Sequence, residues 1–265
     1  MIRTLTESDR KQVLDYLYKD QNYNIFPIGD IEKFGFDQDF QTVYGEFNEK
    51  GEYLSVFLLY RENAIYYSHL NHFNHEYLEI FKQHHFEIIN GKSELIELLK
   101  PHLVDFDIKK TYFCQAKKIT AEIPSNTQDV MVLTTKYDCE RLYDLLADIE
   151  EFSITRKSKE DFVEGKLKSI SMGITLYLED DGKIVSTVAT TAETTKSAMV
   201  VAVGTAKPYR KKGYASKLML ALMDYYINGK GKDLCLFYDN PEAGKIYLRL
   251  GFEYLGLWDM CVRKK

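Results

Sequence analysis

Residues 200–216 read VVAVGTAKPYRKKGYAS. The apolar, mostly β-branched start of this stretch predicts a strand, and residues 217–226 carry apolar side chains at helical spacing. Between them lies a basic loop that contains one glycine, Gly213. A helix N-terminus presents unpaired N–H groups and the positive end of its dipole to an anion, and a glycine lets that anion approach the backbone. The stretch therefore predicts a phosphate-binding turn; the alternative is a solvated basic loop before a surface helix.

The glycine spacing of this loop excludes two common phosphate-binding motifs. A Walker A loop requires G-x-x-x-x-G-K-[ST], and a dinucleotide-binding loop requires G-x-G-x-x-G, whereas only one glycine is present here. The remaining pattern is Arg210-x-x-Gly213-x-Ala215. It resembles the [Q/R]-x-x-G-x-[G/A] signature of the GNAT superfamily of acyl-CoA-dependent N-acyltransferases.

A second motif begins at Asn240, where the sequence reads NPEAGKIYLRLGF. Asn240 followed by Pro241 predicts a helix N-cap and first helical residue. Tyr247 follows Asn240 by about two helical turns and so lies on roughly the same face. The motif resembles the GNAT pattern N-x-x-A-x-x-x-Y-x-x-x-G-F at every fixed position. The alternative is a capped amphipathic helix with a core tyrosine.

The resemblance implies where an acyl-CoA co-substrate binds. Its pyrophosphate would lie on the loop, its pantetheine arm beside the preceding strand and near Asn240, and Tyr247 would protonate the departing thiolate. The implied acetyl-CoA-binding residues are Val203, Gly204, Thr205, Arg210, Lys211, Lys212, Gly213, Tyr214, Ala215, Ser216 and Asn240. No metal is expected. Glu193, in a predicted turn between two strands, is the candidate general base; a water relay, with Glu193 merely solvated, is the alternative.

The order of predicted elements indicates two α/β units, residues 1–120 and 127–265, joined by a linker at residues 118–129. The second unit reads strand, two helices, three-strand meander, helix, strand, helix, strand, which resembles the whole GNAT fold. We therefore expect an α/β (α+β) protein with a mixed, mainly antiparallel sheet flanked by helices. The first unit begins similarly but lacks the glycine loop. It is either a degenerate GNAT-like copy, as in bacterial tandem GNAT proteins, or an unrelated α/β domain.

Composition limits the classes of partner. The formal charge of −5 over 265 residues argues against bulk nucleic-acid binding. Residues 1–125 hold 14 Lys and Arg against 20 Asp and Glu, an excess of six negative charges that could attract a cationic amine. The N-terminal ten residues do not resemble a secretory leader, and no apolar run is long enough to cross a membrane. We expect a cytoplasmic protein, with a homodimer among the expected assemblies.

The cysteines and histidines do not form a metal-binding pattern. The four cysteines are far apart and contain no C-x-x-C, so we expect buried thiols. Five of the six histidines fall between residues 69 and 85, without the spacing of a known zinc helix. We favour a surface position for them over a metal site.

The predicted function is that of an N-acetyltransferase acting on a primary amine of a small molecule or protein. Twenty tyrosines and fifteen phenylalanines could line an aromatic acceptor pocket, although such residues more often build cores. One alternative is a non-catalytic acyl-CoA-binding or regulatory module. Another is an aminoacyl-tRNA-dependent transferase with paired halves, which the lack of a wider basic patch disfavours.

Overall fold

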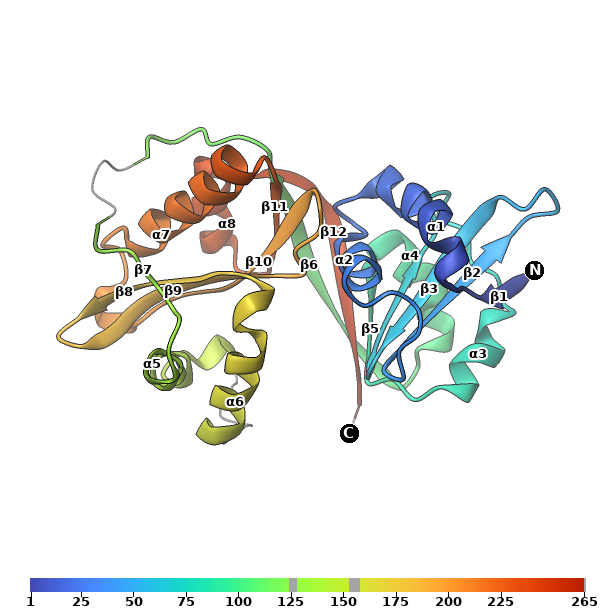
Figure 1. The fold of residues 1–265 in the computed structure, drawn as a ribbon, viewed down its shortest axis with the longest axis horizontal. Helices are drawn as coiled ribbons and strands as arrows, with labels where there is room; N and C mark the ends of the chain where they lie inside the picture. Colours follow the sequence, from blue (N-terminus) through green and yellow to red (C-terminus); the bar gives the residue numbers. More distant parts are fainter. Residues whose placement is uncertain (124–127, 153–157, 265) are drawn as a thin grey trace. The chain divides into compact units, whose positions relative to one another are not determined.

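The computed structural model describes residues 1–123, 128–152 and 158–264, shown in Figure 1. The chain divides by its internal contacts into two compact units. Unit 1 comprises Met1–Phe113, Phe237–Asp239 and Tyr254–Lys265, and unit 2 comprises Cys114–Leu236 and Asn240–Glu253.

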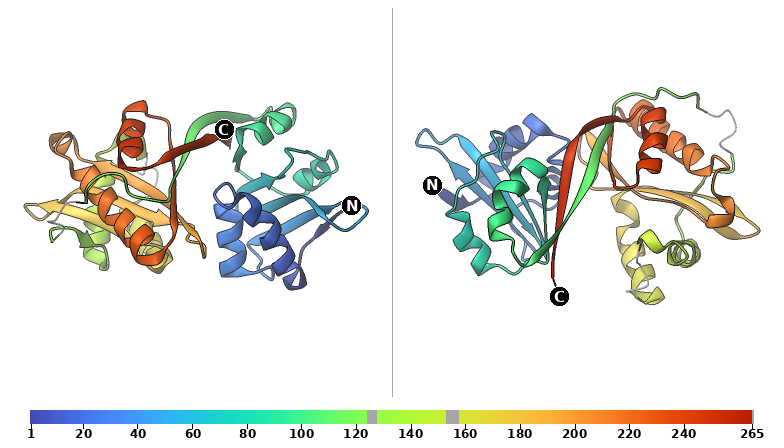
Figure 2. Two further views of the ribbon diagram at one scale, coloured as in Figure 1. Left: turned by 90° about the horizontal axis from the view of Figure 1, so that it is seen from above. Right: turned by 180° about the vertical axis from the view of Figure 1, so that it is seen from behind.

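Unit 1 is a sheet with helices on both of its faces. Its elements are β1 (Ile2–Thr4), α1 (Arg10–Leu17), α2 (Ile25–Phe34), β2 (Gln41–Phe47), β3 (Tyr53–Tyr60), β4 (Asn63–Tyr67), α3 (Tyr77–Gln83), β5 (Ile88–Lys92), α4 (Ser93–Leu99) and β6 (Phe106–Ala116), whose last residues belong to unit 2. The strands β1 to β4 pair antiparallel in chain order, and β4 then pairs with β5 in parallel. Figure 2 shows α1 and α2 on one face of this sheet and α3 and α4 on the other.

Unit 2 repeats this plan. Its elements are β7 (Met131–Val132), α5 (Lys136–Ala147), α6 (Lys159–Ser169), β8 (Thr175–Asp180), β9 (Lys183–Thr191), β10 (Ser197–Thr205), α7 (Tyr214–Met223), β11 (Asp233–Tyr238) and α8 (Pro241–Leu250), followed by β12 (Glu253–Arg263). The strands β7 to β10 pair antiparallel, and β10 pairs with β11 in parallel. The helices α7 and α8 cover one face, and α5 and α6 cover the other (Figure 1). The predicted fold class is therefore confirmed, and the two halves of the chain share one element order.

Local sequence explains the ends of these elements. Thr135 and Asp138 form a capping box at the start of α5. The hairpin between β8 and β9 turns at Asp181 and Gly182, both with positive φ, as a two-residue turn of the primed type requires. The α7 helix runs on from Met223 into a π-helical segment, Asp224–Gly229.

Each unit has its own buried core. In unit 1, the buried core includes Ile28 and Ile31 of α2, Phe57 of β3 and Leu99 of α4. In unit 2, one core cluster joins Leu142 and Leu146 of α5 to apolar side chains that include Val163 of α6 and Tyr177 of β8. The four cysteines are buried and unbridged, as predicted. No helix in the described parts of the chain has both the length and the apolar character that a bilayer crossing requires.

Two features differ from the sequence analysis. The strand β5 was not predicted; its short sequence IINGK, with a glycine and a lysine, carries a weak strand signal. The last strand, predicted at the end of the second unit, instead pairs antiparallel with β5 and belongs to unit 1. Of the predicted linker, residues 124–127 lie outside the described part of the chain.

Candidate functional site

The strand β10 has an open edge along its second half. It pairs with β11 only through Ser197, Ala198 and Met199, whereas its pairing with β9 continues to Thr205. A bulge interrupts that second pairing between Val201 and Gly204, where Ala202 adopts a φ of 53°. Beyond Met199, the edge of β10 that faces away from β9 is therefore available to an extended ligand.

The end of β10 is closely packed and hydrogen-bonded to β9. Gly204 is buried, and a Cβ there would lie 2.8 Å from the Phe152 ring and 3.0 Å from Ile149. The Ser186 hydroxyl donates to the Gly204 carbonyl oxygen at 3.0 Å and lies 2.8 Å from the Thr205 hydroxyl. Gly204 is required here because these neighbours leave no room for a side chain.

The basic loop leads from β10 to α7. The Arg210 guanidinium donates to the Thr205 carbonyl oxygen at 3.0 Å and so folds back onto the strand. Lys211 has a φ of 63°, and Gly213, the N-cap of α7, has a φ of 84°. A Cβ at Gly213 would meet no atom within 4 Å, so the glycine is favoured there by its backbone conformation.

This loop exposes unpaired N–H groups. For residues 211–216, the described chain supplies no hydrogen-bond acceptor to the backbone N–H groups, and no side chain caps α7. Lys211, Lys212 and Gly213 are exposed. The Tyr209 ring stacks on Tyr214 and lies 4.9 Å from the Lys212 ammonium. Unpaired donors, the α7 dipole and several cations thus meet at one place, which is the arrangement that binds phosphate.

The helix α8 presents the second motif. The Asn240 Oδ1 accepts from the Glu242 N–H at 2.9 Å and caps the helix, and Asn240 is exposed. Tyr247 is 7% exposed and its ring packs on Phe252. Burial raises the pKa of Tyr247 to about 12, so the hydroxyl keeps its proton at neutral pH. Arg249 of α8 donates to the Ser216 hydroxyl of α7 at 3.3 Å, which links the two motifs.

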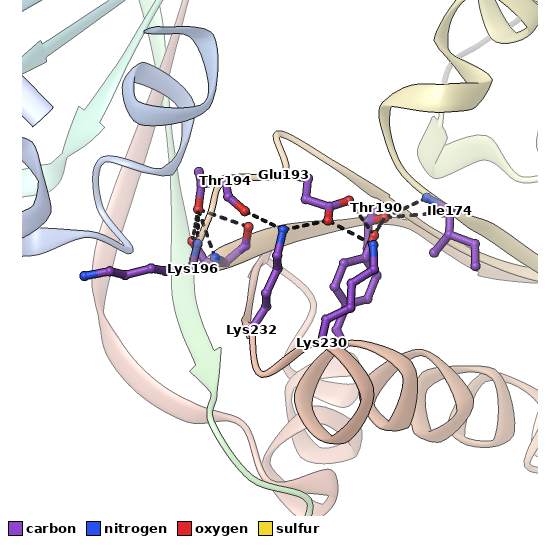
Figure 3. A network of polar contacts seen from close by, with 9 residues as sticks. Ile174, Thr190, Glu193, Thr194, Lys196, Lys230 and Lys232 are labelled. Atoms are coloured by element: carbon purple, nitrogen blue, oxygen red, sulfur yellow. Dashed lines mark hydrogen bonds and ion pairs between the residues drawn. The ribbon is translucent and has the colours of Figure 1, made fainter. Parts of the chain in front are cut away.

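Glu193 lies in the β9–β10 turn within a polar network, shown in Figure 3. Its carboxylate accepts from Lys232 at 2.7 Å, from Lys230 at 3.0 Å and from the Tyr226 hydroxyl at 3.1 Å. Burial alone would raise the pKa of Glu193, but the two ammonium groups outweigh it and lower that pKa. The network ties the turn to the segment before β11. A carboxylate held ionised by two lysines is a weak proton acceptor.

Lys166 of α6 is a candidate that the sequence analysis did not identify. Its ammonium donates to the Thr175 hydroxyl at 2.8 Å, and in the described residues it has no carboxylate partner. Burial lowers the pKa of Lys166. Thr175 pairs with Ala189, and Ala189 pairs with Val201 at the β10 bulge. Paired residues face the same side of a sheet, so Thr175 lies about 10 Å from Val201 on the α6 face. No sequence motif marks Lys166; among the described lysines it is distinguished by a pKa that burial lowers.

The structure thus places the predicted residues in two groups. The loop, the end of β10 and the first turn of α7 lie together, with α8 linked to them through Arg249. Glu193 lies beyond the opposite end of β10, and the strand from Ser197 to Val201 alone spans about 13 Å. The histidines make separate contacts, such as His69 with Asp20 and His72 with Glu46. In the described residues no cluster of His, Cys, Asp and Glu could hold a metal.

The model of the acetyltransferase (GNAT) family matches residues 139–252. Among curated proteins, no sequence matches the chain.

Solved structures resemble nearly the whole chain. A GCN5-related N-acetyltransferase from Sphaerobacter thermophilus has a TM-score of 0.62 at 14% identity, over 98% of this chain and 94% of that one. A tandem GNAT protein from the clavulanic acid biosynthesis pathway has a TM-score of 0.61 at 12% identity, over 98% and 97%. A Drosophila protein has a TM-score of 0.67 at 12% identity, over 98% of each chain. At these identities the likeness shows a common fold that includes both units.

Proposed function

We propose that this chain, whose residues 139–252 form a domain of the acetyltransferase (GNAT) family, transfers an acetyl group from acetyl-CoA to a primary amine of a small molecule or a protein. The observation that carries the proposal is the set of unpaired N–H groups at residues 211–216, directly after a strand with an open edge. Pyrophosphate and an extended pantetheine arm are the ligand parts that such a pair of features accommodates.

In the proposed complex, the CoA pyrophosphate lies on the N-terminus of α7 between Arg210 and Ser216. The pantetheine arm pairs with the free edge of β10 at Val203–Thr205, as an added strand would. The Asn240 amide nitrogen donates to this arm, because the Oδ1 of the same side chain is already used in capping α8. The thioester then lies further back along β10, towards the bulge.

The proposed chemistry is direct transfer. The lone pair of the neutral amine attacks the thioester carbonyl carbon, and a backbone N–H of β10 stabilises the oxyanion. The tetrahedral intermediate expels the CoA thiolate, and the amine nitrogen loses one proton. Tyr247 donates a hydrogen bond to the departing sulfur. A phenol with a pKa of about 12 holds its proton more tightly than a thiol of pKa about 8.5, so this hydrogen bond comes before any proton transfer.

Two side chains compete for the role of general base. Glu193 is ionised but has a lowered pKa and lies beyond the start of β10. Lys166 has a lowered pKa that brings its neutral form towards physiological pH, and it lies on the face where Val201 is exposed. We propose Lys166 as the proton acceptor, directly or through one water, with Glu193 retained as the alternative.

The proposal is tested by thermal denaturation with acetyl-CoA, followed by thiol release over a panel of amines. A ligand that binds the native state raises the melting temperature, and the rise grows with the logarithm of ligand concentration above the Kd. Gly213→Asp should remove this rise, because it places a carboxylate and a strained residue at the pyrophosphate; Gly182→Asp, at another exposed positive-φ glycine, is the matched control. Retained acetyl-CoA binding in Gly213→Asp contradicts the loop assignment.

The second candidate function is that of a non-catalytic acyl-CoA-binding module, which the ion-paired state of Glu193 favours. Stabilisation by acetyl-CoA without thiol release on any amine would support it over the transferase.

A further inference from the structure

Unit 1 contains a pocket of about 290 Å³ beside α3 and the C-terminal end of β12. This volume is near the lower end of the range found for ligand pockets, so the pocket suits a small molecule. Its apolar wall is formed by Leu78 and Phe81 of α3 together with Phe86, Leu103 and Phe106. The last three side chains are buried, whereas the two from α3 are only half-buried. None of these residues belongs to the candidate acetyl-CoA site.

Arg263 of β12 also lines the pocket and is held in place from several sides. Its backbone N–H donates to the Glu87 carbonyl oxygen at 2.8 Å, and its side-chain Nε donates to the Phe86 carbonyl oxygen at 3.1 Å. The guanidinium carbon lies 4.5 Å from the centre of the Phe106 ring and 5.8 Å from that of Phe86. The guanidinium is therefore oriented before any ligand binds, which lowers the entropy cost of binding.

The two terminal nitrogens of Arg263 are available to a ligand. Within the described parts of the chain, Nη1 and Nη2 have no hydrogen-bond acceptor, and no carboxylate forms an ion pair with the guanidinium. The parallel N–H groups of a guanidinium match the two oxygens of a carboxylate.

The other charged residues at the pocket indicate the charge of the ligand. Lys82 is already paired with Glu79 at 2.7 Å, and Asp105 and His102 are exposed lining residues. Among the described lining residues, Arg263 is therefore the permanent cation that lacks a carboxylate partner. A single such cation balances a monoanion, whereas a phosphate dianion would lack a second counter-charge and would be repelled by Asp105.

We infer that this pocket binds a small organic monocarboxylate with an apolar body. The carboxylate oxygens accept from Nη1 and Nη2 of Arg263, and the body of the ligand lies against Leu78, Phe81 and Leu103. Phe86 and Phe106 position the guanidinium. Such a ligand is neither an acetyl donor nor an amine acceptor, so the inference goes beyond the proposed function and does not depend on it.

The experiment compares an anion with a neutral molecule of the same shape. The full-length protein is added to para-fluorophenylacetate, which is ionised at neutral pH, or to para-fluorophenylacetamide, and binding is followed by fluorine NMR. We expect a saturable change of the carboxylate signal, with a Kd at least about tenfold below that of the amide, because hydrogen bonds to a charged acceptor are the stronger ones.

Two substitutions test the role of Arg263. Arg263→Gln keeps an N–H group that can donate to the Phe86 carbonyl but removes the charge and the paired donors, so it should bind both probes equally weakly. Arg61→Gln is the matched control, because Arg61 also lies over aromatic rings, those of Phe40 and Tyr60, but outside the pocket. It should keep the preference for the carboxylate. A cooperative thermal transition shows that each variant is folded.

A second pair of variants tests the pocket with Arg263 intact. Leu78→Trp places a larger side chain at the half-buried wall and should weaken the binding of the carboxylate at least about tenfold. Leu98→Trp, at an exposed position of α4 outside the pocket, should leave it unchanged. Equal affinity of the wild type for the two probes, no saturable change with either probe, equal losses in Arg61→Gln and Arg263→Gln, or undiminished carboxylate binding in Leu78→Trp would overturn the inference.

Discussion

At the scale of single residues, the Tyr247 hydroxyl is expected to contribute to the rate of acetyl transfer. Tyr247→Phe keeps the buried ring and its contact with Phe252 but removes the hydroxyl. We expect kcat to fall about 100-fold, in the range typical of a lost proton or hydrogen-bond donor, with little change in acetyl-CoA affinity. Steady-state kinetics and a thermal titration check the two parts separately. Unchanged kcat would remove Tyr247 from the reaction.

The pH dependence of the rate identifies the base. If Lys166 accepts the proton, its lowered pKa gives kcat/KM an ascending limb below the ordinary lysine pKa of about 10.5. Glu193, with its pKa lowered from 4.5, is fully ionised across this range and gives no such limb. Lys166→Met should abolish the limb, and Lys168→Met, on the exposed side of α6, should leave it. A limb that survives in Lys166→Met belongs to the acceptor amine.

The Asp30 carboxyl group makes the free energy of unfolding depend on pH. Its pKa is raised by burial to about 7 in the folded protein and is near 3.8 in the unfolded chain. As the pH rises, Asp30 therefore loses its proton at a lower pH in the unfolded chain than in the folded protein. The free energy of unfolding therefore falls as the pH rises from about 4 to about 7 and stays reduced above that. Asp30→Asn should raise Tm by several degrees at pH 8 and leave it nearly unchanged at pH 4. Equal shifts at the two pH values would contradict this account.

At the scale of elements, Asn240 both caps α8 and is proposed to bind the pantetheine arm. Two substitutions of Asn240 separate these roles. Asn240→Asp keeps an oxygen that can accept from the Glu242 N–H, and it removes the amide donor. We expect Tm to stay constant while KM for acetyl-CoA rises. Asn240→Ala removes both groups and should also cost about 1 kcal/mol of stability, or roughly 2–4 °C in Tm. If Asn240→Asp binds acetyl-CoA as well as the wild type, the amide does not contact the pantetheine arm.

The sequence predicted elements best where local rules act alone. The α8 helix has an N-cap and a proline at its first position, so its start was predicted as found, and Gly251 with a φ of 119° follows its last residue. The strand β5 was missed because its pairing with β4 and β12 decides its structure, and no local pattern encodes that pairing. The same limit applies to the site. The loop at Gly213 has a motif, whereas Lys166 is distinguished by a pKa that burial lowers, and this burial depends on how α6 packs on the sheet.

At the scale of the whole molecule, the position of β12 makes the two halves of the chain inseparable. Unit 1 draws its strand next to β5 from Tyr254–Lys265, including the buried Trp258 and Cys261. A fragment of residues 1–120 should therefore remain partly unfolded, and addition of a peptide of residues 253–265 should restore a cooperative transition. Denaturation followed by circular dichroism checks both. A fragment of residues 1–120 that folds cooperatively without the peptide would show that β12 is dispensable.

The pairing of β5 with β12 also bears on how the protein is made. A ribosome completes residues 1–113 long before it reaches residue 254, and at ordinary elongation rates the delay is on the order of ten seconds. During that time the nascent first half carries a β5 edge whose final partner does not yet exist, and such an edge pairs readily with other chains. Unit 1, most of which is synthesised first, is thus completed only when the last strand has been made. We therefore expect the first half of the chain to be most prone to aggregation before translation reaches β12.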